Sequence, residues 1–186
     1  AHTVKVQSYS LEALNPADPQ AEWLRKAWLS PEAHQQLIAV AKEAGVQFLA
    51  TPFDAASLVM LQGLGLTRIK IASSQARETW WQQMPAVVSY PWGRMPDPVP
   101  SLVVMPVCAI PLYPTPLEAV TSSTFLPGWS DHTVGVSVPI MMIGSAVTYL
   151  EVHVTIEGAR HMPWDKTMDH VRLLRTLIED GETVRS

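Results

Sequence analysis

Apolar and polar residues follow one another along this chain in short runs that predict strands alternating with helices. Seven runs are short, apolar or alternating with period two, and typical of strands; they cover residues 4–7, 46–50, 68–72, 85–89, 102–107, 128–132 and 148–153. Helical spacing predicts helices over residues 31–44, 54–63, 135–146 and 168–180, with shorter ones near 23–28 and 117–122. The pattern therefore predicts an α/β fold.

Local signals support three of these helices. Ser30 is a good N-cap and Pro31 suits the first helical position. The apolar stripe of that helix is predicted to consist of Leu37, Val40, Ala41 and Ala44. Asp54 is predicted to cap the next helix. Residues 135–146 are apolar on nearly every side, which predicts a helix packed between two layers, with Pro139 in its first turn.

The order of strands and helices predicts parallel strands joined by crossovers, over residues 1–186 as a single domain. Only a proline-rich stretch separates the strands at 85–89 and 102–107, too short for a crossover helix, so a helix has been trimmed or replaced there. In such folds the functional site lies at the carboxyl ends of the strands. Thr51, Lys70 and Ser73 lie at such ends.

Composition excludes several classes of protein. The chain has 186 residues, 47% hydrophobic and 16% charged, as a compact globular domain has. A net charge of −4 argues against a general binder of nucleic acid or of membrane surfaces. The single cysteine, Cys108, excludes a disulfide within the chain. No signal-like segment or membrane span of ~20 residues is present, so a cytoplasmic location is expected.

Two histidines are the first candidates for chemistry. His132 and His153 each follow an apolar run, so parallel neighbouring strands would place both imidazoles at one rim, as in a two-histidine metal site. Glu151 shares the face of His153 and could orient it. The alternative is that His132 caps a turn and His153 is a half-buried structural histidine. Lys5 and Gln7 share one strand face, which is either a binding face or a solvated one.

Six motifs in this order resemble one family, the N-acetylneuraminate (sialic acid) synthases, which condense phosphoenolpyruvate with an N-acetylated amino sugar. The motifs are Val4-Lys5-Val6-Gln7, Phe48-Leu49-Ala50-Thr51-Pro52-Phe53-Asp54, Ile69-Lys70-Ile71-Ala72-Ser73, Tyr113-Pro114-Thr115-Pro116, Ser130-Asp131-His132-Thr133 and Glu151-Val152-His153. The resemblance implies a TIM-type (β/α) barrel, here reduced to about seven strands. It also implies a transferase of carbohydrate biosynthesis that forms a carbon–carbon bond and yields a nonulosonic acid.

The resemblance assigns roles at the matching positions. It implies that the phosphate and carboxylate of phosphoenolpyruvate bind to Lys5, Thr51, Lys70, Ser73, Ser89 and Ser130. The sugar would contact Gln7, Tyr113 and Asp165, and the catalytic set would be Lys5, Lys70 and Asp165. His132 and His153 would be the ligands of a divalent metal, Mn²⁺ or Mg²⁺, that serves as Lewis acid.

Departures from the family keep a second function open. The family's first strand, with its Glu-containing motif, and its C-terminal antifreeze-like domain are not found in this chain. Ser74-Gln75 stands where the family has Gly-Glu, Pro111 where it has Asn, and Val152 where it has Lys. The alternatives are thus a reduced synthase or a non-catalytic relative that binds metal and phosphoenolpyruvate, or acts in assembly.

Assembly into a homodimer is expected on two grounds. The strands at 4–7 and 148–153 would lack a common neighbour, and open edges recruit another chain. Seven tryptophans, including the pair Trp80-Trp81, exceed what a core of this size needs, and aromatic residues are enriched at interfaces. The alternative is a monomer in which the N-terminal residues or the loop at residues 8–29 fold back over the opening.

Overall fold

Two compact units divide the chain, Ala1–Val87 and Val88–Ser186. The computed structural model describes residues 2–120, 127–145, 147–159 and 161–185. Strands and helices alternate in each unit, as the hydrophobic pattern predicts. None of the described helices is both long enough and apolar enough to cross a membrane.

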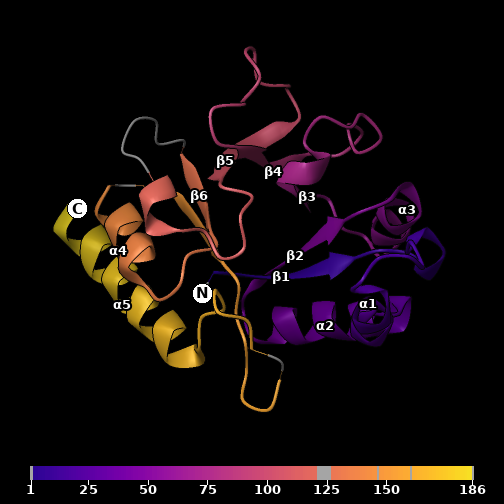
Figure 1. Ribbon diagram of the computed structural model, residues 1–186, viewed down its shortest axis with the longest axis horizontal. Coiled ribbons are helices and arrows are strands. Elements are labelled where there is room, and N and C mark those ends of the chain that lie inside the picture. The colour runs from indigo at the N-terminus through magenta and orange to yellow at the C-terminus, as the bar shows by residue number, and fades with distance from the viewer. Residues whose placement is uncertain (1, 121–126, 146, 160, 186) are drawn as a thin grey trace. The chain divides into compact units, whose positions relative to one another are not determined.

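Unit 1 is built on a parallel pair of strands, β1 (Thr3–Ser8) and β2 (Gln47–Pro52). Its other elements are η1 (Leu11–Ala13), α1 (Ala21–Ala27), α2 (Pro31–Glu43), α3 (Ala55–Gly63), β3 (Ile69–Ile71) and η2 (Ser73–Gln75), where η marks a short 3₁₀ helix. In the β1–β2 register Lys5 lies opposite Leu49 and Gln7 opposite Thr51. Helix α2 lies along this pair in the ribbon (Figure 1). The core of the unit includes Leu49, Ala50, Leu58, Leu61, Ile69 and Ile71, all at most 2% exposed.

The predicted start of α2 is confirmed, but its predicted apolar stripe is partly wrong. The Ser30 hydroxyl oxygen accepts a hydrogen bond from the Ala33 amide at 3.2 Å. Ala41 is buried as expected, whereas Val40 is 60% exposed and Ala44 is also exposed. The buried stripe is completed by His34, which the pattern did not count as a core residue. Its two ring nitrogens bond Ser8 Oγ at 2.7 Å and the Ser30 carbonyl at 2.9 Å, so the polar ring is satisfied inside.

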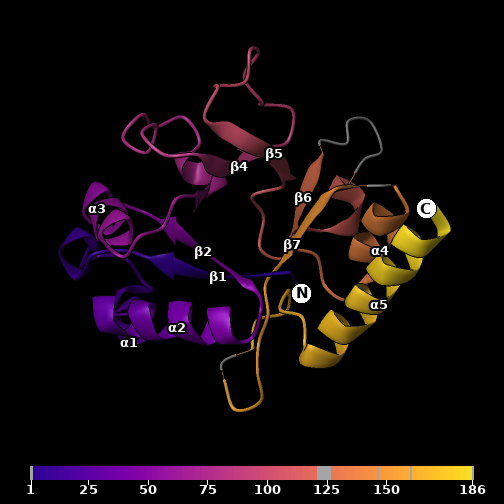
Figure 2. The ribbon, with the colours of Figure 1, turned by 180° about the vertical axis from the view of Figure 1, so that it is seen from behind.

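Unit 2 is a layer of strands covered by two helices. Strand β4 (Ala86–Pro91) begins in unit 1 and continues into unit 2, where the order of neighbours is β4, β5 (Val103–Ala109), β6 (Gly128–Asp131) and β7 (Tyr149–Val152). Strands β5, β6 and β7 are parallel. Helix α4 (Ser137–Gly144) packs on β6 and β7, and α5 (Met168–Arg185) packs on α4 (Figure 2). Strands β4 and β5 are joined without a helix over residues 92–102, as the proline-rich stretch predicts.

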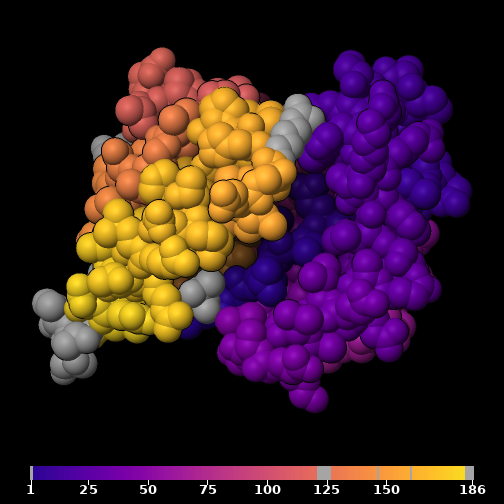
Figure 3. Space-filling view, turned by 90° about the horizontal axis from the view of Figure 1, so that it is seen from below, coloured from indigo at the N-terminus to yellow at the C-terminus, as the bar shows by residue number. Residues whose placement is uncertain are grey.

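The core of unit 2 lies between these strands and α4. It contains Cys108, Ile110, Trp129, Val138 and Met142. Trp92 packs against it, with its ring centroid 6.0 Å from that of Trp129. The face of α5 that points away from this core is exposed to solvent, and its yellow atoms lie at the surface in the space-filling view (Figure 3).

Three further expectations need correction or qualification. Helix α4 is not buried on all sides, because Ile140 is 38% and Met141 46% exposed while Val138 and Met142 face the core. The predicted helix near 117–122 is only a 3₁₀ turn, η3 (Leu117–Ala119), and residues 121 and 122 lie outside the described residues. Trp81 is fully buried with its Nε1–H donating to the Gln75 carbonyl at 3.0 Å, so it belongs to the core and not to an interface.

Candidate active site

The two candidate metal ligands lie side by side where β6 and β7 end. The parallel register sets Asp131 opposite Val152, so His132 and His153 are the next residues of each strand. Their ring centroids are 5.2 Å apart with the planes at 64°. Both imidazoles therefore lie at one rim of the sheet in unit 2, as the sequence pattern predicts.

The ring of His132 is held in one tautomer. It is 4% exposed, and its Nδ1 lies 2.9 Å from the Ile110 carbonyl. Because a carbonyl oxygen only accepts, Nδ1 carries the proton and Nε2 of the neutral ring keeps its lone pair. Histidines that bind metals are commonly oriented by such a bond from the other nitrogen to a backbone carbonyl.

Tyr113 joins the two histidines into one aromatic cluster. Its ring centroid lies 4.1 Å from that of His132, 6.0 Å from that of His153 and 5.5 Å from that of Trp164. Burial, and to a smaller extent the negative charge of Glu151, raises the pKa of Tyr113 to about 12. Like an ordinary tyrosine phenol, it is neutral near pH 7 and able to donate a hydrogen bond. The place of Trp164 in this cluster was not predicted from the sequence.

Glu151 lies next to the cluster on β7. Its carboxylate accepts a hydrogen bond from Ser130 Oγ at 3.4 Å and another from the Tyr149 hydroxyl at 3.1 Å. Ser130, a predicted phosphoenolpyruvate ligand, is 3% exposed on β6, directly opposite Glu151 in the register. Two other predicted residues also lie in unit 2: Ser89 is buried on β4, and Asp165 accepts the Met162 amide at 2.7 Å.

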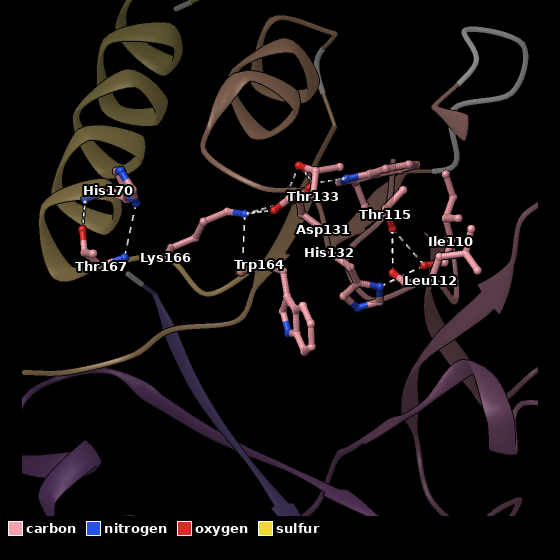
Figure 4. A network of polar contacts seen from close by, with 11 residues as sticks. Ile110, Leu112, Thr115, Asp131, His132, Thr133, Trp164, Lys166, Thr167 and His170 are labelled. Atoms are coloured by element: carbon pink, nitrogen blue, oxygen red, sulfur yellow. Dashed lines mark hydrogen bonds and ion pairs between the residues drawn. The ribbon is translucent and has the colours of Figure 1, made fainter. Parts of the chain in front are cut away.

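A buried ion pair beside the histidines was missed by sequence reasoning. Lys166 Nζ lies 2.8 Å from Asp131 Oδ2, and both side chains are 0% exposed (Figure 4). The Asp131 carboxylate also accepts the Thr133 hydroxyl, at 3.0 and 3.1 Å, and the Trp129 indole N–H at 3.3 Å. Asp131 lies within a quoted motif, but nothing in the sequence pairs it with Lys166, because the two residues meet only through the fold.

Unit 1 contains the cationic residues of the predicted anion site. Lys5 Nζ donates to Thr51 Oγ1 at 3.5 Å across the β1–β2 pair, and Thr51 is 1% exposed. Lys70, on β3, is 2% exposed with its Nζ donating to the Ile71 carbonyl at 3.2 Å. Ser73 is half-buried and begins η2. Two lysines and two hydroxyl side chains of this kind suit an anion with phosphate or carboxylate oxygens.

A pocket of about 220 Å³ lies at the carboxyl ends of β1 and β2. It is lined by Gln7, Tyr9, Ala13, Leu14, Leu24, Phe53 and Asp54. The Asp54 carboxylate is already used within unit 1, where it accepts the Ser10 amide and the Ser57 amide, both at 2.7 Å. Gln7 thus offers an amide to a pocket whose other walls are largely apolar.

Metal ligation is limited to what two imidazoles can supply. Within the described ranges, no group of three or more His, Cys, Asp or Glu side chains could hold a metal ion. Two neutral imidazoles with one fixed tautomer still fit a borderline divalent ion whose other positions are filled by water or substrate oxygens.

Comparison with known proteins gives one consistent family. Residues 1–84 match the model of the NeuB family. The chain is 26% identical over 214 residues to the N,N'-diacetyllegionaminic acid synthase of Legionella pneumophila, covering 98% of this chain and 60% of that protein. It is 37% identical over 71 residues to the synthase of the same name from Campylobacter jejuni, covering 38% of this chain and 21% of the relative.

A solved structure shares the fold. The N-acetylneuraminic acid (sialic acid) synthetase from Leptospira borgpetersenii, crystallised in complex with citrate, superimposes with a TM-score of 0.84 at 20% identity. The match covers 100% of this chain and 75% of that chain. The chain spans about 60% of the length of the Legionella relative, so it corresponds to a part of such a protein.

Proposed function

Since this chain is a member of the NeuB family and contains part of its domain, we propose that it acts as a sialic acid synthase-type transferase. The proposed reaction condenses phosphoenolpyruvate with an N-acetylated amino sugar to give a nonulosonic acid. The observation that supports it best is the pairing of His132 and His153 beside Tyr113 where two parallel strands end. Carboxyl ends of parallel strands are where barrel enzymes place their chemistry.

The anionic substrate would be held mainly by lysines. Lys5 and Lys70 are the cations of β1 and β3, and Lys5 donates to the Thr51 hydroxyl at 3.5 Å. We assign them to the phosphate and carboxylate of phosphoenolpyruvate, with Thr51, Ser73, Ser89 and Ser130 as hydrogen-bond donors. Charge-assisted hydrogen bonds of this type are about twice as strong as neutral ones.

His132 and His153 would hold one divalent ion, Mn²⁺ or Mg²⁺, which would supply Lewis-acid chemistry when bound. The Ile110 carbonyl favours the tautomer of neutral His132 that has its lone pair on Nε2. The hydroxyl of Tyr113 would donate a hydrogen bond to a sugar oxygen. In the reaction, C3 of phosphoenolpyruvate bonds to the aldehyde carbon of the open-chain sugar, water adds at C2, and phosphate leaves.

The sugar contacts are assigned in each unit by itself. Asp165 and Tyr113 are assigned to its hydroxyl groups. In unit 1 the pocket beside Gln7 suits an N-acyl group, because the amide side chain can pair with the substrate's amide while Leu14, Leu24 and Phe53 surround a methyl group. N-acetyl groups occur in the product names of the Legionella and Campylobacter relatives.

A non-catalytic relative that only binds these ligands is the second candidate. It is favoured by Gln75, because an amide cannot exchange the proton that a carboxylate could. General acids and bases typically contribute ~10²–10⁴-fold each, so such a change leaves binding intact while it slows turnover.

Phosphate release from phosphoenolpyruvate, with and without Mn²⁺ and across a panel of N-acetylated amino sugars, separates the two candidates. A synthase releases phosphate only when metal and the right sugar are both present. A binding protein is protected by phosphoenolpyruvate in a thermal shift but releases no phosphate with any sugar. A protein that neither releases phosphate nor is protected overturns both assignments.

Replacement of Lys70 tests the anion site itself. Lys70→Ala should weaken phosphoenolpyruvate binding about tenfold or more, since it removes a charge-assisted contact worth ~1.5–3 kcal/mol. The matched control is Lys26→Ala, which removes an exposed lysine paired with Glu22 at 2.7 Å. If phosphoenolpyruvate protected the wild type and Lys70→Ala equally against thermal unfolding, the anion site would lie elsewhere.

The metal ligands are tested by calorimetry. His132→Ala/His153→Ala should abolish Mn²⁺ binding, whereas His161→Ala, at an exposed position, should leave it unchanged. If the double variant bound Mn²⁺ with unchanged affinity, the assignment of these histidines as metal ligands would be wrong.

A further inference from the structure

We propose that Lys166 is a positioning residue that holds both site histidines, His132 through its side chain and His153 through its main chain. The inference rests on the proposed function, in which these two imidazoles form the reactive end of the site. It assigns a role to a buried charge that the reaction itself does not use.

The side chain of Lys166 fixes the residues on either side of His132. Its ammonium group lies 2.8 Å from the Asp131 carboxylate and donates to the Thr133 carbonyl at 2.7 Å. A third bond, at 3.2 Å, goes to the Trp164 carbonyl. An ammonium has three donors, so its hydrogen-bonding capacity is filled and its orientation is determined.

The main chain of Lys166 holds His153. The Lys166 amide donates to the His153 carbonyl at 2.8 Å, and the Thr155 amide donates to the Lys166 carbonyl at 3.0 Å. These bonds form an isolated parallel bridge between Val154 and Lys166. One residue therefore links the segment after β7 to the end of β6.

The same residue also sets the position of the aromatic rings. Trp164 lies two residues before Lys166, and its carbonyl accepts a hydrogen bond from the ammonium. Its ring packs edge-on against Tyr113, with the ring centroids 5.5 Å apart. Tyr113 in turn lies against both imidazoles. A displacement of Lys166 would therefore move the nearby Trp164 ring (Figure 4). Through that ring it would alter the space between Tyr113 and the two histidines.

Stability alone is a poor reason for this ion pair. Both side chains are 0% exposed, and the desolvation of two charges can cancel their attraction, so an apolar pair of similar volume is often equally stable. A pair of charges differs from an apolar pair in its directional bonds. Here the bonds of the ammonium end on two segments, residues 131–133 around His132 and Trp164 beside Tyr113, which is what a positioning role requires.

The test compares geometry and stability in separate variants. Lys166→Met alone leaves the Asp131 carboxylate buried without its cation and is expected to unfold more easily. Asp131→Asn/Lys166→Met removes both charges and keeps the approximate volumes, so it is expected to regain stability toward urea. Lys166→Arg keeps the charge but changes the geometry of the hydrogen-bond donors. It replaces the double variant in the test if the double variant does not fold. Lys26→Met, at the exposed pair with Glu22, is the matched control.

Ring contacts in the metal-free protein are the primary measurement. In the wild type, nuclear Overhauser contacts should join the Tyr113 ring to His132 and to Trp164. The Asp131→Asn/Lys166→Met and Lys166→Arg variants, folded, should lose or weaken the Tyr113–Trp164 contact while Lys26→Met keeps it. A folded double variant with all contacts retained would mean that Lys166 is only a structural residue and would overturn the inference.

Metal affinity is the second measurement. Co²⁺ binding, followed by its visible absorption, should weaken roughly tenfold or more in the folded double variant, as for other residues that orient metal ligands. If the wild type binds no Co²⁺, the metal assignment of the proposed function fails, and the ring contacts still decide whether Lys166 positions the histidines. If the double variant bound Co²⁺ as tightly as the wild type although its ring contacts were altered, Lys166 would position only Tyr113 and Trp164. That result would contradict the proposal that it positions the histidines.

Discussion

Buried polar side chains of this protein differ in whether their hydrogen-bonding groups are satisfied. His34 is 0% exposed and both of its ring nitrogens have partners, and Lys166 fills its three donors. Tyr90, only 2% exposed, differs from them, because its hydroxyl has no hydrogen-bond partner among the described residues. Burial also raises the pKa of Tyr90, which keeps that hydroxyl protonated.

Tyr90→Phe is therefore expected to leave the free energy of unfolding unchanged or to raise it slightly, because no hydrogen bond is lost and a buried polar atom is removed. The matched variant Tyr9→Phe removes a hydroxyl that donates to the Leu24 carbonyl at 2.8 Å, and it should cost ~0.5–1.5 kcal/mol. Urea denaturation measures both. A loss of that size in Tyr90→Phe as well would reveal a partner for the Tyr90 hydroxyl in solution.

At the scale of elements, helix α3 shows how one carboxylate defines the start of a helix. Asp54 accepts the Ser57 amide, and the Ser57 hydroxyl lies 3.4 Å from the Asp54 amide, which completes a capping box. The same carboxylate accepts the Ser10 amide and hydroxyl. Desolvation acts to raise the pKa of Asp54, but the hydrogen bonds from Ser10 and Ser57 outweigh it, and the pKa is lowered from 3.8.

Since the folded state favours ionised Asp54, its stabilising effect is fully present above pH 3.8 and is lost as the pH falls through the lowered folded pKa. Asp54→Ala should cost about 1–2 kcal/mol near neutral pH, the loss of a good cap. Asp54→Asn keeps a capping oxygen but cannot titrate, so its difference from the wild type should shrink in acid. Urea denaturation from neutral pH to below pH 3.8 measures this difference in the free energy of unfolding, with Asp18→Asn, at an exposed position, as the control. If the difference between Asp54→Asn and the wild type stayed constant with pH, the lowered pKa of Asp54 would be contradicted.

Gly128 allows β6 to lie close to both of its neighbours. A Cβ at this position would lie 2.8 Å from Val107 Cγ2, 3.3 Å from the Pro106 carbonyl oxygen and 3.3 Å from Tyr149 Cβ. Gly128→Ala should therefore destabilise the protein by ~1–3 kcal/mol through overpacking.

Gly144→Ala is the control, because an added Cβ there meets nothing within 4 Å and alanine favours the helix. Thermal unfolding followed by circular dichroism compares the two variants. Equal melting temperatures would show that β5 and β7 can move apart at no cost.

At the scale of the whole molecule, we expect the predicted homodimer to form through exposed apolar side chains on α4 and α5. Ile140 and Met141 on α4 are 38% and 46% exposed, and Leu173 on the adjoining α5 is 44% exposed. Large apolar side chains on packed neighbouring helices are typical of an interface. The expected partner is a second copy of this chain, related by a two-fold axis.

Light scattering behind a sizing column should give twice the chain mass of 20.5 kDa. Met141→Glu should shift the protein toward the monomer, whereas Val59→Glu, at a 63% exposed position on α3, should not. A monomer mass for the folded wild type at micromolar concentration would rule the dimer out.

Much of the secondary structure of this protein follows from its sequence alone. Periodicity of two or 3.6 and cap residues such as Ser30 and Asp54 act over a few neighbouring positions, and the structure has strands and helices at nearly all the predicted places. The end of each apolar run also located His132 and His153, because the carboxyl ends of parallel strands lie at one edge of a sheet. Ordered motifs identified the family, which the comparisons confirm.

Tertiary structure alone decided which side chains meet. Asp131 pairs with Lys166, and Trp164 packs on Tyr113, because β6, β7 and the segment after them come together in space; no spacing in the chain encodes those contacts. The same reason explains why His34 replaced Val40 on the buried face of α2. A local pattern ranks residues by hydrophobicity, whereas burial of a polar ring depends on partners such as Ser8 that only the folded chain supplies.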